Sequence, residues 1–356
     1  MAQQTATLSA LPVHGGKRLP SVTVDSYNLE TKDDGGGFLG DRVRKSAFND
    51  AIEEGRKALR KLGDDPFGKT ATEDISKSDL DALLTKGEPE AAGVLQGAIE
   101  SFAKELAFVI RRFLKLKPWH DTGRIVIGGG FRVHRFGELA IGRAGVLLKS
   151  DKIDVDLVPI RNDPDDAGLI GAAHLAPSWM FKGHDAILAV DIGGTNIRAG
   201  VVDLKPKRSK DLSKAAVWKS ELWCHADEKK MTRDEAVGRL VEMLEKLIAR
   251  ATKEGFQLAP FIGVGCPGVI HEDGAIDRGA QNLPGNWESS KFNLPASLCE
   301  AIPKIADHDT AALMHNDAVV QGLSEVPFMT DVKHWGVLTI GTGLGNARFT
   351  NRSGKA

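Results

Sequence analysis

The chain of 356 residues is long enough for two domains, each with its own hydrophobic core. Its 47 Lys and Arg residues nearly balance its 48 Asp and Glu residues, which disfavours a nucleic-acid partner, because such proteins usually carry a basic excess. No apolar run approaches the roughly 18 residues of a membrane span, and residues 1–20 lack the apolar core of a signal peptide. Three scattered cysteines fit a reducing cytoplasm and have no metal-ligand spacing.

The N-terminal third is predicted to be mostly helical. Apolar residues recur at helical spacing up to Pro118, whereas PSVTVDSYNLE alternates like a strand. The patterns predict a strand over 20–30 and helices over 46–63, 79–86 (with Ser78 as N-cap) and 88–116.

An apolar strand over 124–128 then runs into three glycines, Gly128, Gly129 and Gly130, followed by Phe131. Glycines without Cβ atoms can form a floor for a flat ring, although a plain strand-to-helix turn would use them as well. Both interpretations stay open for this motif alone. Further on we expect a helix over 137–148, a strand over 155–160, a helix over 165–176 and a linker over 177–183.

The most informative stretch is AILAVDIGGTNIRAGVVD, residues 186–203. It predicts two apolar strands joined by a turn in which Gly193 and Gly194 follow a path closed to β-branched residues. Such a turn lets backbone N–H groups approach phosphate oxygens, Thr195 and Asn196 add side-chain donors, and Asp191 can hold Mg²⁺ through water. A structural hairpin would also use Gly-Gly, but the combination favours phosphate binding.

The C-terminal part continues the alternation of strands and helices. A Thr-x-x-Glu box opens a helix over 232–253, and a strand over 261–265 ends in Cys-Pro-Gly. A helix is expected after residue 310, and a strand over 335–340 enters a second glycine turn, Gly341-Thr-Gly-Leu-Gly-Asn346.

Taken together, these motifs resemble those of the ROK (repressor, open reading frame, kinase) family of bacterial sugar kinases. The similarity extends over about residues 75–348 and depends on seven segments: IVIGGG (125–130), DAGLIGAA (166–173), DIGGT (191–195), GCPGV (265–269), NLPG (282–285), Asn316-Asp317 and GTGLG (341–345). The resemblance implies an α/β fold of two actin-like, ribonuclease H-like lobes around a central cleft. One lobe would be residues 184–320 plus 165–176, and the other 20–160 plus 333–356.

The order of the motifs differs from that of the family. There, the last helix and the adenosine-side strand follow the second phosphate loop, whereas here they precede the first. Each motif occurs once, which favours a circular permutation over a fusion of two incomplete copies. Permutation is physically feasible because the termini of compact domains lie at the surface and are often close together.

The resemblance also implies an ATP-dependent transfer of a phosphoryl group to a hexose hydroxyl, with Asp317 as general base and Mg²⁺ near Asp191. Taken alone, Asp317 would be an ordinary acid at a helix N-terminus. The implied phosphate contacts are Asp191, Gly193, Gly194, Thr195, Asn196, Gly341, Thr342, Gly343 and Gly345. The implied adenosine contacts are Gly128, Gly129, Gly130 and Phe131, and the implied sugar contacts are Gly268, Asn282, Asn316 and Asp317.

Two family segments are missing from the chain. Neither the Glu-x-Gly-His segment that grips the sugar nor the Cys-x-Cys-Gly-x-x-Gly-Cys zinc site occurs, so no zinc site is expected. This keeps open a catalytically silent sugar or nucleotide sensor of the same fold. We expect a cytoplasmic protein whose partners are a sugar and a nucleotide, with no nucleic acid and no membrane. Polyphosphate stays open as an alternative donor, and so does a homodimer.

Overall fold

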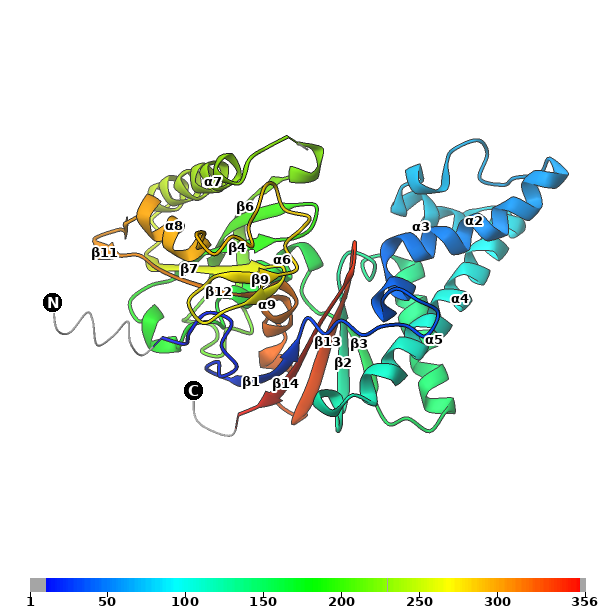
Figure 1. Ribbon diagram of the computed structural model, residues 1–356, viewed down its shortest axis with the longest axis horizontal. Helices are drawn as coiled ribbons and strands as arrows, with labels where there is room; N and C mark the ends of the chain where they lie inside the picture. The colour runs from blue at the N-terminus through cyan, green and yellow to red at the C-terminus, as the bar shows by residue number, and fades with distance from the viewer. Residues whose placement is uncertain (1–10, 229, 353–356) are drawn as a thin grey trace. The chain divides into compact units, whose positions relative to one another are not determined.

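The computed structural model describes residues 11–228 and 230–352, which form a mixed α/β protein (Figure 1). The chain divides into two compact units. Unit 1 contains the described residues up to Asn28, Asn162–Lys333 and the residues from Ala347 onwards, and unit 2 contains Leu29–Arg161 and His334–Asn346. The predicted lobes divide the chain differently at two places: residues 20–28 and 347–352 were assigned to the lobe of residues 20–160 and 333–356, whereas here they belong to unit 1. Within the described residues, no helix is both long and apolar enough to cross a membrane.

Unit 1 is built on a five-stranded sheet with the order β12-β7-β4-β5-β6. The strands β4, β5 and β6 are antiparallel neighbours, whereas β4, β7 and β12 run parallel. Their bounds are Ala186–Ile192 (β4), Ile197–Asp203 (β5), Ala216–Trp223 (β6), Leu258–Cys266 (β7) and Ala311–Asn316 (β12). All seven residues of β4 are buried, as expected for a central strand covered on both faces.

Helices cover this sheet. They are α6 (Pro164–Ala172), α7 (Arg233–Lys253), α8 (Leu294–Ala301) and α9 (Asp317–Leu323). Because side chains alternate along a strand, Leu188 and Val190 join the core that includes α7, and Asp191 faces the opposite side, against α6. Unit 1 also contains 3₁₀ turns at Ser178–Phe181, His225–Asp227 and Val326–Phe328 and two short strand pairs, β8 (Val269–Ile270) with β9 (Ile276–Arg278) and β10 (Lys304–Ile305) with β11 (His308–Asp309).

The two ends of the described chain come together in unit 1. Strand β1 (Val22–Tyr27) pairs antiparallel with β14 (Leu344–Asn351), from Val22 opposite Asn351 to Tyr27 opposite Ala347. The Arg352 N–H also donates to the carbonyl of Ser21 at 3.1 Å. Segments more than 300 positions apart in the sequence are therefore hydrogen-bonded neighbours.

Unit 2 contains a parallel arrangement in which β2 (Arg124–Gly128) lies between β13 (His334–Ile340) and β3 (Asp156–Pro159) (Figure 1). Its helices are α2 (Lys45–Leu62), α3 (Lys77–Lys86), α4 (Pro89–Leu114) and α5 (Arg135–Ser150), with 3₁₀ turns at Leu39–Val43, Thr72–Asp74 and Lys117–Trp119. Helix α4 packs against α2, α3 and α5, and its stripe of apolar residues, from Leu95 to Phe113, is buried as the periodicity predicted.

Local sequence signals set several element ends, and two predictions were wrong. Gly63 ends α2 in the left-handed region at φ 81°, and Thr232 with Glu235 forms the expected capping box of α7. The N-cap of α3 is Ser76, whose hydroxyl accepts from Asp79 N–H, and not Ser78. The segment after residue 310 forms strand β12 before the helix starts at Asp317, because Ala311–Asn316 pairs with β7 along its whole length.

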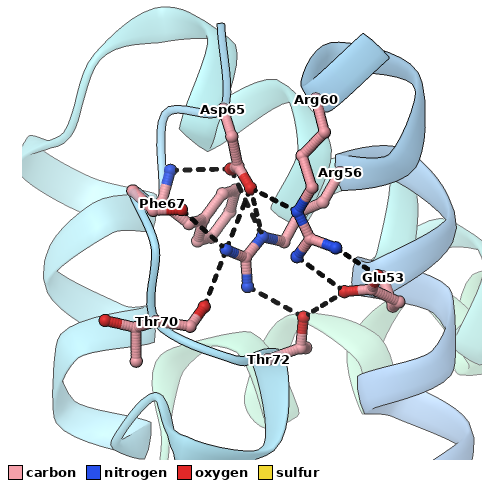
Figure 2. Close-up of polar contacts among 8 residues, drawn as sticks. Glu53, Arg56, Arg60, Asp65, Phe67, Thr70 and Thr72 are labelled. Atoms are coloured by element: carbon pink, nitrogen blue, oxygen red, sulfur yellow. Dashed lines mark hydrogen bonds and ion pairs between the residues drawn. The ribbon is translucent and has the colours of Figure 1, made fainter. Parts of the chain in front are cut away.

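A polar network in unit 2 is centred on Arg56, whose side chain is fully buried (Figure 2). Its guanidinium pairs with Asp65 at 3.0 Å, donates to the Thr72 hydroxyl at 2.8 Å and to the Thr70 carbonyl at 2.8 Å, and lies over the ring of Phe67. A buried charge is tolerated only when its hydrogen bonds are satisfied. Arg56 therefore organises the segment between α2 and α3, which has little regular structure of its own.

Candidate active site

Three parallel strands of unit 1 end at the same edge of the sheet. Asp191 near the end of β4 lies opposite Gly265 of β7, and Cys266 lies opposite Asn316, the last residue of β12. Asp317 follows as the first residue of α9. The carboxyl edge of parallel strands is where α/β proteins usually bind ligands. Two aspartates far apart in the sequence are thereby brought to this edge.

Asp191 is a buried carboxylate, with 8% of its surface exposed. Within the described part of the chain it accepts no hydrogen bond, although Arg198, opposite it on β5, is an electrostatic neighbour. Burial, and next the charge of Asp317, raise the pKa of Asp191 to about 7. A buried carboxylate without donors is costly unless a proton or a cation neutralises it. The site therefore suits a cation.

Asp317 has a raised pKa as well, of about 6, because burial disfavours its charged form. Hydrogen bonds from the Ala318 N–H, at 2.9 Å, and from Asn316 act in the opposite direction and limit the increase. A carboxylate whose pKa lies near neutral pH can take up a proton and release it again under physiological conditions. Asp317 thus has the electrostatics of a general base.

Asn316 holds the start of α9 in place. Its side-chain oxygen accepts from the N–H groups of Ala318 and Val319, and its amide nitrogen donates to the Gly268 carbonyl at 3.0 Å. The structure therefore connects two predicted sugar-contacting residues, Asn316 and Gly268. Gly268 has φ 102°, and a Cβ atom there would lie 2.3 Å from the Arg278 carbonyl oxygen, so only glycine fits.

The turn between β4 and β5 is closed by a hydrogen bond from the Gly193 N–H to the Asn196 carbonyl at 2.8 Å. His225 Nε2 lies 2.9 Å from the Gly193 carbonyl and supports the turn from outside. The expectation that Gly193 and Gly194 follow a path closed to β-branched residues is wrong: neither has a positive φ, and no atom lies closer than 3.4 Å to a Cβ placed on either. Their small size leaves the backbone accessible.

The predicted sugar loop lies beside this turn. A Cβ atom on Gly194 would be 3.6 Å from Nδ2 of Asn282, and the side chains of Asn282 and Thr195 are exposed. Unit 1 thus brings together Asp191, Gly194 and Asn282 with the Asn316–Asp317 pair, as well as Gly268. This set contains two carboxylates, two side-chain amides and accessible backbone, which are groups that bind hydroxyls, phosphates and cations.

The second glycine turn belongs to unit 2. Gly341, Thr342 and Gly343 are exposed, the Gly341 N–H donates to the Gly343 carbonyl at 3.0 Å, and Gly345 lies in β14. The Lys45 N–H, at the start of α2, donates to the Gly341 carbonyl at 2.9 Å. The turn is therefore accessible and is held by a helix N-terminus.

The predicted adenosine-side motif also lies in unit 2. Gly129, between Gly128 and Gly130, has φ 83°, and a Cβ there would lie 2.2 Å from the Ile340 carbonyl oxygen. The ring of Phe131 is 5% exposed and packs against the aromatic rings of Phe48, Phe102 and Phe136. Phe131 thus contributes to the core of unit 2.

Sequence reasoning did not place several residues beside Asp191. A Cβ on Gly168 of α6 would lie 2.4 Å from Asp191 Cγ, and Arg198 pairs with Asp165 at 2.5 Å. Burial raises the pKa of the neighbouring Asp166. Nothing in the sequence identified this helix as the neighbour of Asp191. Among the described residues, no three His, Cys, Asp or Glu side chains are grouped so as to hold a metal ion.

No protein-family model matches the chain, and no curated protein matches it. Among solved structures, a ROK family glucokinase from Streptomyces griseus in complex with glucose and AMPPNP is 22% identical over 48% of this chain and 47% of its own, with a TM-score of 0.34. A ROK hexokinase from Thermus thermophilus is 22% identical over 48% of this chain and 49% of its own, with a TM-score of 0.32. The chain spans about half the length of each of these structures.

Proposed function

We propose that this protein is a sugar kinase of the ROK type that transfers the γ-phosphoryl group of ATP to a hexose hydroxyl. The observation that carries the proposal is the pair Asp191 and Asp317, which meet at the carboxyl edge of one sheet with pKa values raised to about 7 and about 6. Structural ion pairs usually lower the pKa of a carboxyl group, whereas catalytic carboxylates are often shifted towards neutral pH.

In this reaction Asp317 takes the proton of the acceptor hydroxyl as its oxygen bonds to the γ-phosphorus. The bond between that phosphorus and the β–γ bridging oxygen breaks, and ADP leaves. Phosphoryl transfer needs little covalent help from the protein, so most of the catalysis is positioning and charge stabilisation. Asn316 and Gly268 hold Asp317 in place, and Asn282 binds the sugar.

Asp191 is proposed to bind Mg²⁺ through water, because its buried carboxylate lacks a hydrogen-bond donor. The ion would neutralise charge on the phosphates. The backbone of Gly193–Asn196 contacts phosphate oxygens. For unit 2 we retain the predicted phosphate contacts Gly341, Thr342, Gly343 and Gly345 and the adenosine contacts at Gly128–Gly130.

A circular permutation is part of the proposal, and the connections of the strands support it. Strand β4 enters a glycine turn and continues as β5, which pairs antiparallel with β6; β13 enters a glycine turn and continues as β14, which pairs antiparallel with β1. Strands β4, β7 and β12 are parallel in that order, as are β13, β2 and β3. The counterpart of β6 is thus β1, at the opposite end of the chain from β14. This is the strand order expected of a permuted chain whose new termini were opened between two paired strands, here β14 and β1.

The test is ADP release with Mg·ATP against a panel of hexoses and amino sugars, for the wild type, Asp317→Asn and the control Asp307→Asn, which changes an exposed acid of unit 1. Turnover with one sugar that is lost only in Asp317→Asn supports the proposal. Parallel reactions use polyphosphate as the donor, and the sugar phosphate that forms is measured directly. If no donor supports turnover while ATP still raises the melting temperature, the protein is a silent sensor and the kinase proposal is wrong.

A further inference from the structure

The segment before β1 is fastened to β12 by hydrogen bonds on both sides of one residue. The Gly15 N–H donates to the Met314 carbonyl at 3.0 Å, and the Met314 N–H donates to His14 Nδ1 at 3.1 Å. Gly15 has φ 57°, and a Cβ there would lie 2.1 Å from the Ile270 carbonyl oxygen. The segment therefore fits tightly between β12 and strand β8, which follows Gly268.

His315 is the next residue of β12, and it is almost fully buried. Its Nδ1 accepts from the Asn316 N–H at 2.8 Å, and its Nε2 lies 3.3 Å from the Gly16 carbonyl. Burial lowers the pKa of His315 to about 4, so the ring is neutral at pH 7. Because Nδ1 accepts, the proton is on Nε2 and is donated to Gly16.

Tyr27 completes the arrangement from β1 and is the only tyrosine of the chain. Its ring meets the ring of His315 edge to face, with centroids 5.0 Å apart. Its hydroxyl donates to the Ile270 carbonyl at 3.2 Å and accepts from the Ile270 N–H at 3.3 Å. Tyr27 thus contacts both β12, the strand that precedes Asp317, and β8, the strand that follows Gly268.

Asn316 Nδ2 also donates to the Gly268 carbonyl, so that these contacts form a closed network joining β1, β12 and the Gly268–Ile270 segment. We propose that Tyr27 and His315 are positioning residues that hold the Asn316–Asp317 junction in register with the Gly268–Ile270 segment, so that the base and the sugar-contacting loop keep a productive geometry. This inference rests on the proposed kinase function for its effect on turnover. The structural part of the inference, the coupling of Tyr27 to the Asn316 amide, does not depend on the kinase function.

His315 is almost fully buried and Tyr27 is half-buried, which argues against a simple surface attachment. A displacement of about 1 Å of a reacting group can cost about a hundredfold in rate. His315 lies two residues before the proposed base Asp317. A loss of contact there should therefore affect turnover more than stability.

The experiment compares Tyr27→Phe, which keeps the ring and loses the hydroxyl, with Thr350→Val. Thr350 donates a hydroxyl hydrogen bond to Asp25 between β14 and β1, and has no part in the site. For Tyr27→Phe we expect kcat for the sugar to fall about tenfold with the KM for ATP unchanged. Thr350→Val should leave both constants unchanged.

Hydrogen exchange of the Asn316 amide provides a readout that does not depend on turnover. Its exchange should become faster in Tyr27→Phe but not in Thr350→Val, and His315→Asn, which retains an acceptor near Nδ1, should be affected less than His315→Ala. If the wild type shows no kinase activity but the exchange responds in this way, the proposed function fails and the coupling stands. Unchanged exchange together with unchanged kcat in Tyr27→Phe would overturn the coupling itself.

Discussion

The α-carbon of Gly168 lies against the carboxylate of Asp191, so that a Cβ atom on Gly168 would be 2.4 Å from Asp191 Cγ and 2.6 and 2.7 Å from its two oxygens. Helix α6 therefore closes over the carboxylate and removes it from water, which is the main cause of its raised pKa. A Cβ of Gly171 on the same helix would lie 1.7 Å from the Val320 carbonyl oxygen of α9. One helix thus positions both Asp191 and the helix that begins with Asp317.

Gly168→Ala should reduce activity strongly, because the added methyl group must displace the Asp191 side chain. We expect a loss of about 1–3 kcal/mol in the free energy of unfolding and a loss of at least about tenfold in kcat. Gly238→Ala is the matched control, since nothing lies within 4 Å of a Cβ at that position of α7 and alanine favours helix. Steady-state kinetics and urea unfolding measure both effects; equal behaviour of the two variants would contradict the steric argument.

Activity should decrease on the acid side with a midpoint near pH 6. The proposed base Asp317 can accept a proton only when it is deprotonated, and burial raises its pKa to about 6. The measurement is kcat/KM between pH 5 and 8, and Asp317→Asn should lose about 10²–10⁴-fold and with it this acid limb. Residual activity of the variant that keeps the same limb would assign the limb to another group.

The stability of the ligand-free protein should fall as the pH rises towards 7. Asp191 has a folded-state pKa of about 7, above its ordinary value of 3.8, so the folded state binds more protons than the unfolded state between these pH values. The free energy of unfolding therefore decreases from about pH 4 to pH 7. Asp191→Asn should reduce this slope, leaving the part that the raised pKa of Asp317 contributes, and should melt higher than the wild type at pH 7, with an advantage that shrinks at pH 5. A parallel pH dependence of both melting temperatures would refute the assignment.

Arg56→Met should destabilise unit 2 by about 3–5 kcal/mol, because it leaves Asp65 without its buried partner (Figure 2). Arg60→Met, which removes a more exposed arginine from the same network, should cost less than about 1 kcal/mol. Hydrogen exchange would localise the loss to the segment 63–75. Similar losses of stability in the two variants would show that burial does not decide how much each arginine contributes to the stability of unit 2.

A variant in which residue 356 is joined to residue 1 should fold with new termini. The 14 residues 353–356 and 1–10 would link Arg352 to residue 11, and the chain would be opened at Lys182–Gly183, which is exposed. Extended, such a link reaches up to about 50 Å. We expect cooperative unfolding and retained ATP-induced stabilisation.

Deletion of 334–356, by contrast, should give insoluble or molten protein, because it removes the partners of β1 and β2. A cooperatively folded deletion variant would contradict the permutation model.

Local patterns were sufficient for much of the fold. The stripe of α4, the capping box of α7 and the buried run of β4 follow from hydrophobic spacing and capping chemistry, which act within a few residues. The same holds for Asp191, because a carboxylate at the end of an apolar strand beside Gly-Gly-Thr is visible without a structure. The resemblance to a kinase family singled out Asp317, which local chemistry would have left as a helix-capping acid.

Contacts between distant segments decided the rest. Ala311–Asn316 forms a strand because β7 provides its pairing partner, and Phe131 is a core residue because three other aromatic rings surround it. The raised pKa values of Asp191 and Asp317 depend on burial, and the contacts of Gly168 and of Tyr27 depend on residues that lie far from them in the sequence. By itself the sequence singled out the groups that are proposed to carry the chemistry. Only the tertiary structure decided how close they lie and how far they are removed from water, because both depend on packing between segments that the sequence separates.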